Sequence, residues 1–439
     1  VGGLEGGHGG RVYARAPTAQ LSPRPPAIRG RMEAGDALDR LARGSGLKVQ
    51  KVGANSYVLT AAPQPKAKSK PLAARLVHRA VQPAMESKPE PDPQDIVVTA
   101  SKRDTLSLRF PGQWSGIDGD EFAPLGVAGS EAIESRSVGF SSTHLAAGRN
   151  KLFIRGIADS SFSGPTQSPV GQYFADMPPG YRGPDPDLKL DDMQSVEILE
   201  GPQGTLYGSG ALGGIVLLKP NMPELGELTG LAVLGGSVTW HGDLGYDASA
   251  VVNAPFGDRV ALRGVGYHAR EGGYIDNVAT GEKDINDIGV TGGRATLTVE
   301  LAPGWFVDAS GVAQRIEGDD SQYADDEGSG LTRDSLVDQP FSSDFTLANL
   351  VVRKDGGAIR FRSTTGGSWQ DVDETFDASI DDRVRQLGQH SKARAVSNET
   401  RVWRPMDGGY SWLVGFSSIV HRYEVSRDLS EEGQLTDLS

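Results

Sequence analysis

The chain has 439 residues and a formal net charge of −13, which argues against a uniformly basic nucleic-acid-binding protein. Glycine contributes 58 residues, about twice its usual share of ~7%, and only 37% of the residues are apolar. No Gly-X-Y repeat and no run of about 18 apolar residues occurs, so collagen and a transmembrane helix are excluded. A turn-rich soluble β protein, a partly disordered chain and a membrane β-barrel remain, because barrel strands need apolar residues only at alternate positions.

Cysteine is absent, which excludes disulfides, zinc–thiolate sites, iron–sulfur clusters and cysteine nucleophiles. The first residues, Val1-Gly2-Gly3-Leu4, contain neither an initiator methionine nor a signal segment. We therefore expect a mature, trimmed or fragmentary chain.

Residues 1–60 predict a small α/β unit. The apolar residues of 32–42 share one helical face, and 47–52 and 56–59 alternate as two strands of a hairpin. One helix and one hairpin make a thin core, so we expect an upstream strand and helix to be missing. Prolines then recur through 61–94, which predicts a linker with room for a short helix at 72–82.

Residues 95–100, with the sequence Asp-Ile-Val-Val-Thr-Ala, follow the linker directly and favour extended structure. One interpretation is an ordinary first strand of the next unit. The other is an exposed strand offered for pairing with the sheet edge of a partner. The position behind a flexible arm favours the second interpretation.

Residues 95–225 form a mixed unit with frequent glycines. Within it, 208–213 matches G-x-G-x-x-G, the pattern of a dinucleotide-binding loop. That loop must open a helix, whereas here a short β-type run follows at 214–220. We therefore interpret 208–213 as a structural glycine turn.

From residue 226 the chain alternates apolar and polar residues over segments longer than usual strands. Nine strands are predicted, at 229–240, 243–254, 259–271, 289–301, 304–316, 344–354, 358–370, 393–404 and 409–425. Short turns alternate with long polar loops near 271–288, 317–343 and 371–392, a pattern typical of transmembrane barrels. Because bacterial barrels have even strand numbers, we expect an interrupted barrel that ends in an external loop.

Catalytic and metal-binding patterns are missing from the sequence. The histidines form no i, i+4 pair, and neither HExxH nor G-x-S-x-G occurs. The acidic stretch 317–327 lacks the ligand spacing of a calcium loop, so a solvated external loop is favoured over a calcium site. We expect no enzyme, no cofactor and no metal.

Four ordered segments resemble the plug domain of TonB-dependent outer-membrane receptors. They are LFIRGI at 152–157, VGQYFADM at 170–177, MQSVEILEGPQGTLYG at 193–208 and ALGGIV at 211–216. The residues that carry the plug motif are Gly156, Glu197, Gly201, Pro202, Gly204, Tyr207, Gly208, Gly213 and Gly214. In addition, 95–100 resembles the TonB box, 1–60 the second half of the secretin/TonB short N-terminal domain, and 396–402 a recurrent barrel-strand motif.

The resemblance implies a mixed α/β plug domain followed by an incomplete antiparallel transmembrane β-barrel, with about nine of ~22 strands. The TonB box and plug would occupy 95–225 and the barrel strands 226–439. A small partial α/β N-terminal signalling domain would occupy 1–60, ahead of a Pro-rich linker at 61–94.

The resemblance also implies a function. TonB, the energy-transducing partner from the inner membrane, would bind Asp95, Ile96, Val97, Val98, Thr99 and Ala100. The receptor would lie in the lipid of a Gram-negative outer membrane, with its N-terminal domain periplasmic, and would import a bulky ligand, above all a ferric siderophore. Alternatives are signalling to an anti-sigma regulator, uptake of a carbohydrate or cobalamin, and a soluble glycan-binding β-sandwich, which the turn and loop pattern disfavours.

One position departs from the family pattern. Family plugs carry an arginine where this chain has Glu200. We expect Arg155 to pair with Glu399 of the barrel and Glu200 to pair with Arg401, because an unpaired charge inside a barrel is costly. These four residues are the predicted plug lock.

Overall fold

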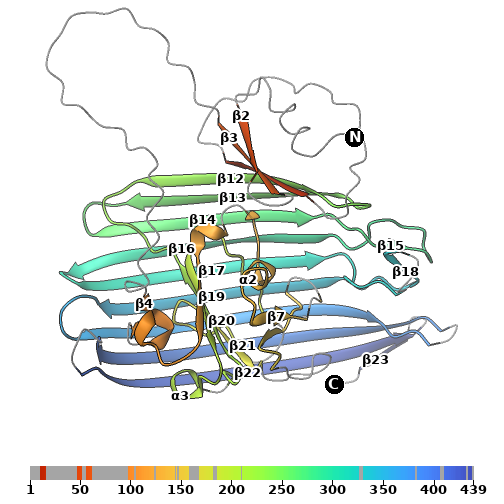
Figure 1. Cartoon of the computed structure of the whole chain (residues 1–439). Coiled ribbons are helices and arrows are strands. Elements are labelled where there is room, and N and C mark those ends of the chain that lie inside the picture. The colour runs from red at the N-terminus through yellow and green to blue at the C-terminus, as the bar shows by residue number, and fades with distance from the viewer. Residues whose placement is uncertain are drawn as a thin grey trace, which may run out of the picture.

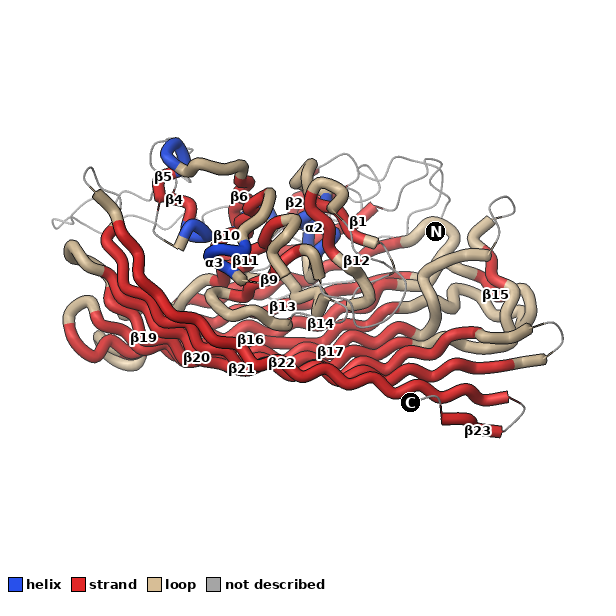
Figure 2. The backbone as a smooth tube through the Cα atoms, turned by 90° about the horizontal axis from the view of Figure 1, so that it is seen from below, coloured by secondary structure: helices blue, strands red, loops and turns tan. Residues whose placement is uncertain are grey.

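The computed structural model describes residues 10–15, 47–51, 56–61 and 97–437, the last with gaps at 103–104, 123–124, 144, 146–147, 158–167, 181–184, 209, 326–329, 381–382, 406–409 and 432–433. One large, mostly antiparallel sheet curves round a smaller mixed unit (Figure 2). The predicted helices at 32–42 and 72–82, the predicted linker from residue 62 onward, Asp95 and Ile96 lie outside the described residues.

Nine strands follow one another in the large sheet after residue 228, and each pairs antiparallel with the next (Figure 1). They are β12 (Thr229–Val238), β13 (Leu244–Pro255), β14 (Val260–Glu271), β16 (Ile288–Ala302), β17 (Trp305–Gly318), β19 (Phe341–Lys354), β20 (Arg360–Asp377), β21 (Arg385–Arg404) and β22 (Trp412–Glu431). The nine predicted strands are confirmed. In β19 the side chains of Ser343, Phe345 and Leu347 are buried and those between them are exposed, because successive residues point to opposite faces.

The connections separate two ends of this sheet. Connections at 256–259, 303–304, 355–359 and 405–411 lie at one end, which we call the short-turn end. Connections at 239–243, 272–287, 319–340 and 378–384 lie at the other end, which we call the long-loop end after 272–287 and 319–340. Two of the long connections carry β15 (Asp276–Asn277) and β18 (Thr332–Arg333), which pair in parallel.

The predicted loop at 371–392 is wrong, because β20 and β21 continue through most of it. This part of both strands lacks the apolar alternation on which the strand prediction depended. It is held instead by an unbroken main-chain ladder from Arg360 to Asp377 and by polar cross-strand pairs such as His390 with Asp373 (2.6 Å).

The N-terminal strands extend the large sheet beyond β12. β1 (Gly10–Arg15) pairs antiparallel with β12 and parallel with β3 (Ser56–Ala61), and β2 (Leu47–Lys51) pairs antiparallel with β3. The predicted hairpin of 47–52 with 56–59 is therefore confirmed.

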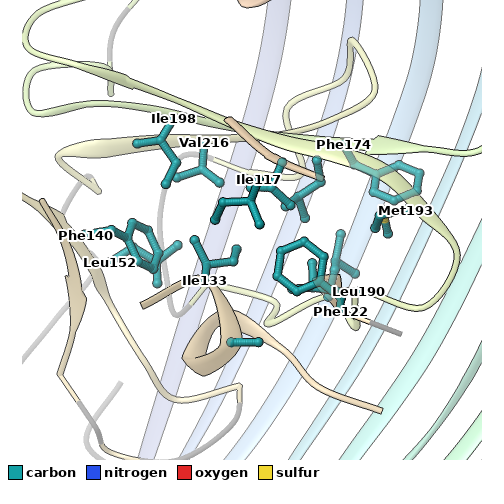
Figure 3. Packing of buried hydrophobic residues seen from close by; sticks show 14 of the residues in the cluster. Ile117, Phe122, Ile133, Phe140, Leu152, Phe174, Leu190, Met193, Ile198 and Val216 are labelled. Atoms are coloured by element: carbon teal, nitrogen blue, oxygen red, sulfur yellow. The ribbon is translucent and has the colours of Figure 1, made fainter. Parts of the chain in front are cut away.

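The smaller unit is built on a four-stranded sheet with the order β6 (Trp114–Asp118), β10 (Met193–Glu200), β11 (Gly214–Pro220) and β9 (Val170–Phe174). Its core contains Ile117, Ile133, Phe174, Ile198 and Val216 (Figure 3). The same cluster includes Val312, Phe345 and Leu347 of the large sheet, so the unit packs directly against that sheet, which we call the wall. We refer to it as the plug unit.

Short elements complete the plug unit. They are β4 (Val97–Val98), η1 (Thr99–Ser101), β5 (Thr105–Leu106), η2 (Ser107–Arg109), η3 (Gly119–Glu121), α2 (Ser130–Glu134), β7 (Phe140–Ser142), β8 (Leu152–Ile154) and α3 (Gly204–Tyr207). At the other end of the chain, β23 (Gln434–Asp437) pairs with β22. Of the helices in the described part of the chain, none is long and apolar enough to cross a membrane.

Candidate functional site

The predicted TonB-binding segment folds against the plug unit. Val97 and Val98 form β4, which pairs with β5, and the chain then turns through η1. Val98 and Ala100 are fully buried. The partner-pairing interpretation expects an exposed strand, whereas Val98 and Ala100 of this segment are buried. We call Val97–Lys102 the latch segment.

Two residues of the plug motif hold the latch segment. The buried carboxylate of Glu197 accepts hydrogen bonds from Thr99 Oγ1 (2.6 Å) and from the backbone N–H of Ala100 (2.8 Å). The hydroxyl of Tyr207 donates to the carbonyl oxygen of Ala100 (2.6 Å), and its ring packs edge-on against Tyr173, with the centroids 4.8 Å apart. Bonds to an ionised acceptor are about twice as strong as neutral ones. A few side-chain bonds, and a β pairing of only two residues, hold this segment.

Lys102 joins the end of the latch segment to the barrel wall. Its backbone is left-handed, with φ at 59°. Its Nζ donates to the carbonyl oxygen of Leu206 (2.8 Å) and to the Glu399 carboxylate of β21 (2.5 Å), and lies 4.2 Å from the centre of the Tyr207 ring. Burial lowers the pKa of the Lys102 ammonium, and Glu399 offsets part of this effect. One ammonium thus links the latch segment, α3 and the wall.

Glu399 belongs to a larger cluster of ion pairs. Arg401 donates to Glu399 (2.7 Å) and to Asp176 (3.0 Å), and Arg362 of β20 also donates to Asp176 (2.7 Å). Burial by itself would raise the pKa of Asp176, but the guanidinium groups of Arg362 and Arg401 hold it well below its usual range. Because Asp176 lies in the turn after β9, this cluster fastens the edge of the plug sheet to two neighbouring strands of the wall.

The pairs expected in the plug lock are wrong. Arg155 binds Glu200 and Gln113, all three within the plug unit. Glu399 binds Lys102 and Arg401 instead. The reason is the path of the chain, since Arg155 directly follows β8 and Glu200 ends β10, and the residues directly before them, Ile154 and Leu199, both approach Gly214. Glu399 lies across the unit, beside the latch segment.

The glycine-rich motif forms a closed loop that carries α3. The backbone N–H of Gly201 donates to Gly213 (2.9 Å), which closes the loop, and Pro202 and Gly204 lie inside it. Gly214 has φ at 148°, and a Cβ there would lie 2.2 Å from the carbonyl oxygen of Leu199. Glycine is required at this approach of two strands. A strand, β11, follows the loop at 214–220, as the structural interpretation of the G-x-G-x-x-G pattern predicts.

Two further motif glycines have positive φ angles, Gly156 beside this loop and Gly208 inside it. Gly156 follows Arg155 after β8 with φ at 67°, and Gly208 ends α3 with φ at 76°. The motif glycines therefore shape the loop that positions Tyr207, one of the residues that hold the latch segment.

A second set of contacts fixes the opposite flank of the plug unit. The carboxylate of Asp192 accepts two hydrogen bonds from Arg263 (2.7 and 2.6 Å) and one from Arg294 (3.3 Å), both on the wall. A separate carboxylate of the plug unit, that of Asp185, is buried and accepts a bond from the backbone N–H of Leu152 (3.0 Å). Burial raises the pKa of Asp185 to about 7, although that bond acts in the opposite direction.

The sequence predictions missed Lys102, Asp176 and Arg362. Lys102 comes directly after the predicted TonB-binding segment, and Asp176 lies inside the motif at 170–177. Arg362 is the direct cross-strand partner of Arg401. Proximity in the sequence could have suggested the first two, but their partners follow only from the way the plug is seated in the wall.

The described residues form no candidate metal site. Among the described residues, no three His, Asp or Glu side chains lie close enough together to hold a metal ion. In the acidic stretch at 317–327, the buried Asp320 is paired with Arg333, whose Nη1 also donates to Ser321 (2.7 Å). That carboxylate therefore serves to fix a connection at the long-loop end.

Comparisons with known proteins support the resemblance seen in the sequence. Residues 111–215 match the TonB-dependent Receptor Plug Domain family. The chain is 27% identical over 218 residues to the pesticin receptor of Yersinia pestis, an alignment that covers 48% of this chain and 30% of that receptor.

Solved structures share the fold. The ferric yersiniabactin uptake receptor FyuA of Yersinia pestis aligns with a TM-score of 0.66 at 18% identity, over 77% of this chain and 53% of that one. The copper transporter OprC aligns with a TM-score of 0.53 at 14% identity, over 74% of this chain and 48% of that one. The chain therefore spans about half the length of these structures.

The plug family covers the unit that holds the latch segment, and the solved structures share both that unit and the curved wall. TonB-dependent receptors are outer-membrane β-barrel proteins. Residues 111–215 thus match the plug domain of TonB-dependent receptors, and the chain shares the fold of such receptors, with a plug domain followed by nine antiparallel strands of a wall.

Proposed function

We propose that this chain takes part in TonB-dependent uptake of a ferric siderophore across the outer membrane. In this proposal the short-turn end faces the periplasm and the long-loop end faces the exterior. Short periplasmic turns and longer external loops are the rule for outer-membrane barrels, which supports the orientation. TonB pulls on the segment at 95–100, and the ligand passes between plug and wall.

The observation that carries the proposal is the attachment of the latch segment. It lies between the plug and β21 and is held by Glu197, Tyr207 and the Lys102–Glu399 pair. Its β pairing covers only two residues. A partner that adds a strand to such a segment gains main-chain hydrogen bonds, and a pull on it breaks the side-chain bonds in turn.

The ligand class rests on the relatives. The pesticin receptor is the relative in sequence, and the ferric yersiniabactin uptake receptor shares the fold. A ferric siderophore is therefore the ligand class that we propose for this receptor. A panel of iron chelates identifies the transported one.

Deletion of 95–100 tests the proposal in living cells. The receptor is expressed from its own gene, and uptake is measured with a panel of ⁵⁵Fe-chelates that includes ferric yersiniabactin. Deletion of 95–100 should abolish uptake of the transported chelate and leave its binding to the cell surface unchanged, because TonB acts from the other side of the plug. A deletion of equal length in the linker, at 77–82, is the matched control and should preserve uptake.

Two results would contradict the proposal. Uptake that survives deletion of 95–100 would remove the role of TonB. Binding of none of the iron chelates, by a receptor that is present and folded in the outer membrane, would remove the siderophore class.

A further inference from the structure

The outward face of the wall, which points away from the plug unit, can be assigned strand by strand. On β21, Arg401 reaches Asp176 of the plug, so the even-numbered residues of this strand point outward. On β20, Arg362 reaches the same carboxylate, so the odd-numbered residues point outward there. The register of β21 with β22 then assigns the even-numbered residues of β22 to the outward face.

An uncharged band crosses this face on β21 and β22. Trp412 and Arg422 are ten positions apart on β22, and the outward residues between them are Val414, Phe416, Ser418 and Val420. Their cross-strand partners on β21 are Val402, Thr400, Asn398 and Val396. A tilted strand needs ~9–11 residues to cross a bilayer, so the band has the length that the apolar layer of an outer membrane requires.

Aromatic and basic side chains mark both margins of the band. At the short-turn end, Trp412 lies opposite Arg404. At the long-loop end, Arg394 lies opposite Arg422 on one side and opposite Trp369 of β20 on the other. Tryptophan is typical of the headgroup level of a membrane, where long basic side chains also reach the interface. We call Trp369, Arg394 and Arg422 the arginine row.

The two arginines of this row are direct cross-strand neighbours, an arrangement that is unfavourable by itself because like charges repel. The Nε of Arg422 lies 2.5 Å from the Glu424 carboxylate, but the Arg422 side chain is 77% exposed. Arg394 is exposed and forms no ion pair within the described part of the chain. Two guanidinium groups with free N–H donors therefore lie side by side at the margin of the band.

Other outward arginines toward the long-loop end have acidic partners within the protein. Arg315 binds Glu317 (2.8 Å) and Asp344 (3.2 Å), and Arg270 binds Asp287. These pairs neutralise the guanidinium groups where they lie. The arginine row contains no acidic residue, so its charge is available to an external anion.

We propose that the arginine row binds the phosphate group of an outer-leaflet lipid headgroup. Guanidinium groups bind phosphate through two parallel N–H donors. The acyl chains of this lipid lie along Val396 and Val420, which are 56% and 71% exposed on the membrane side of the row. In the next row outward, Lys392 lies between Asp371 and Glu424, so the charges alternate there and confine the anionic group to the arginine row. The inference rests on the outer-membrane orientation given in the proposed function.

Lipid binding by the full-length receptor tests the site. The receptor is purified in detergent and incubated with bisphosphorylated lipid A, with the same lipid A after removal of its phosphates, or with phosphatidylcholine. Native mass spectrometry then measures the lipid-bound fraction. The variants are Arg394→Gln and the double variant Arg394→Gln/Arg422→Gln. Arg315→Gln is the matched control for the single variant, because Arg315 is also an outward arginine but already has acidic partners.

The wild type should bind bisphosphorylated lipid A in preference to the two lipids without a phosphate monoester. Arg394→Gln should weaken this binding roughly fivefold and the double variant roughly 30-fold, which is the contribution expected of one and two basic residues near an anionic lipid. Arg315→Gln should bind as the wild type does, and excess inorganic phosphate should leave the lipid bound. An equal loss in Arg315→Gln, equal binding of dephosphorylated lipid A, or displacement by inorganic phosphate would overturn the site.

Uptake of ferric chelate, measured in cells with the same variants, separates this site from the proposed function. A receptor that binds lipid A through the arginine row and imports no chelate would leave the site standing and overturn the proposed uptake. A receptor that imports chelate, but whose double variant binds lipid A as tightly as the wild type, would overturn the site alone.

Discussion

Lys102→Met should weaken the attachment of the latch segment without unfolding the plug. The substitution keeps an unbranched side chain of similar length and removes the charge. It breaks the bond to Glu399 (2.5 Å), the bond to the carbonyl oxygen of Leu206 (2.8 Å) and the contact with the Tyr207 ring. Glu399 keeps its bond to Arg401, so no buried carboxylate is left alone.

The expected size of the effect follows from these contacts. A hydrogen bond to a charged group contributes ~1.5–3 kcal/mol, and a cation–π contact ~0.5–2 kcal/mol. Burial opposes both, as the lowered pKa of the Lys102 ammonium indicates. A net loss of about 1–2 kcal/mol remains, which raises the population of the released segment about 5–30-fold.

Release can be measured with a thiol at a buried position of the latch segment. Val98 is fully buried, so Val98→Cys reacts with a maleimide only when the segment detaches. In isolated outer membranes, adding Lys102→Met should accelerate the reaction by the factor given above. Lys283→Met, on an exposed connection, is the matched control and should have no effect.

A double-mutant cycle separates the ion pair from the other contacts of Lys102. Glu399→Gln alone should also accelerate labelling, and the two substitutions together should add less than their separate effects. An unchanged labelling rate in Lys102→Met would refute the reasoning, because the segment would then be held by other residues. Full additivity would show that the two charges are not coupled.

Three further predictions concern the plug itself. Gly214→Ala should destabilise the plug by more than about 2 kcal/mol, because the new Cβ would lie 2.2 Å from a backbone oxygen. Gly204→Ala is the control and should change the melting temperature little, because a Cβ there has no atom within 4 Å. Equal melting temperatures of the two variants would contradict this prediction. Arg155→Ala should lower the stability of the plug by about 1–3 kcal/mol, because it leaves the Glu200 carboxylate, whose side chain is only 4% exposed, without its partner. Adding Glu200→Gln should restore the melting temperature, and release of the latch segment should not change. Faster release in Arg155→Ala would contradict the assignment of Arg155 to the plug unit alone. Burial raises the pKa of Asp185 from 3.8 to about 7, so between these pH values the folded protein binds a proton that the unfolded chain does not bind. The stabilisation that comes from this proton is complete below about pH 4 and is lost as the pH rises through about 7. Asp185→Asn should therefore flatten the fall in melting temperature over that pH range, and an unchanged slope would assign the dependence to other groups.

The strands of the wall follow from local patterns in the sequence. Apolar residues recur at every second position, and glycine, proline and aspartate mark the turns, so the nine strands could be predicted from residues that are neighbours in the chain. The continuation of β20 and β21 into 371–392 could not be predicted, because it depends on the main-chain ladder and on polar cross-strand pairs rather than on apolar alternation.

The plug motif could also be recognised in the sequence, because its glycines are required by local backbone geometry, such as the close approach of two strands at Gly214. The partners of the charged residues were not. Inward-pointing side chains on β20 and β21 can be named from the alternation, but the residue that meets them depends on how the plug is turned and seated within the wall. Arg155 therefore forms an ion pair with Glu200 of its own unit. Glu399 forms an ion pair with Lys102, which lies 297 positions away in the chain. Local patterns were therefore enough to predict the nine strands and the family resemblance, whereas the partners of the charged residues that hold the latch segment follow from the packing of the plug against the wall.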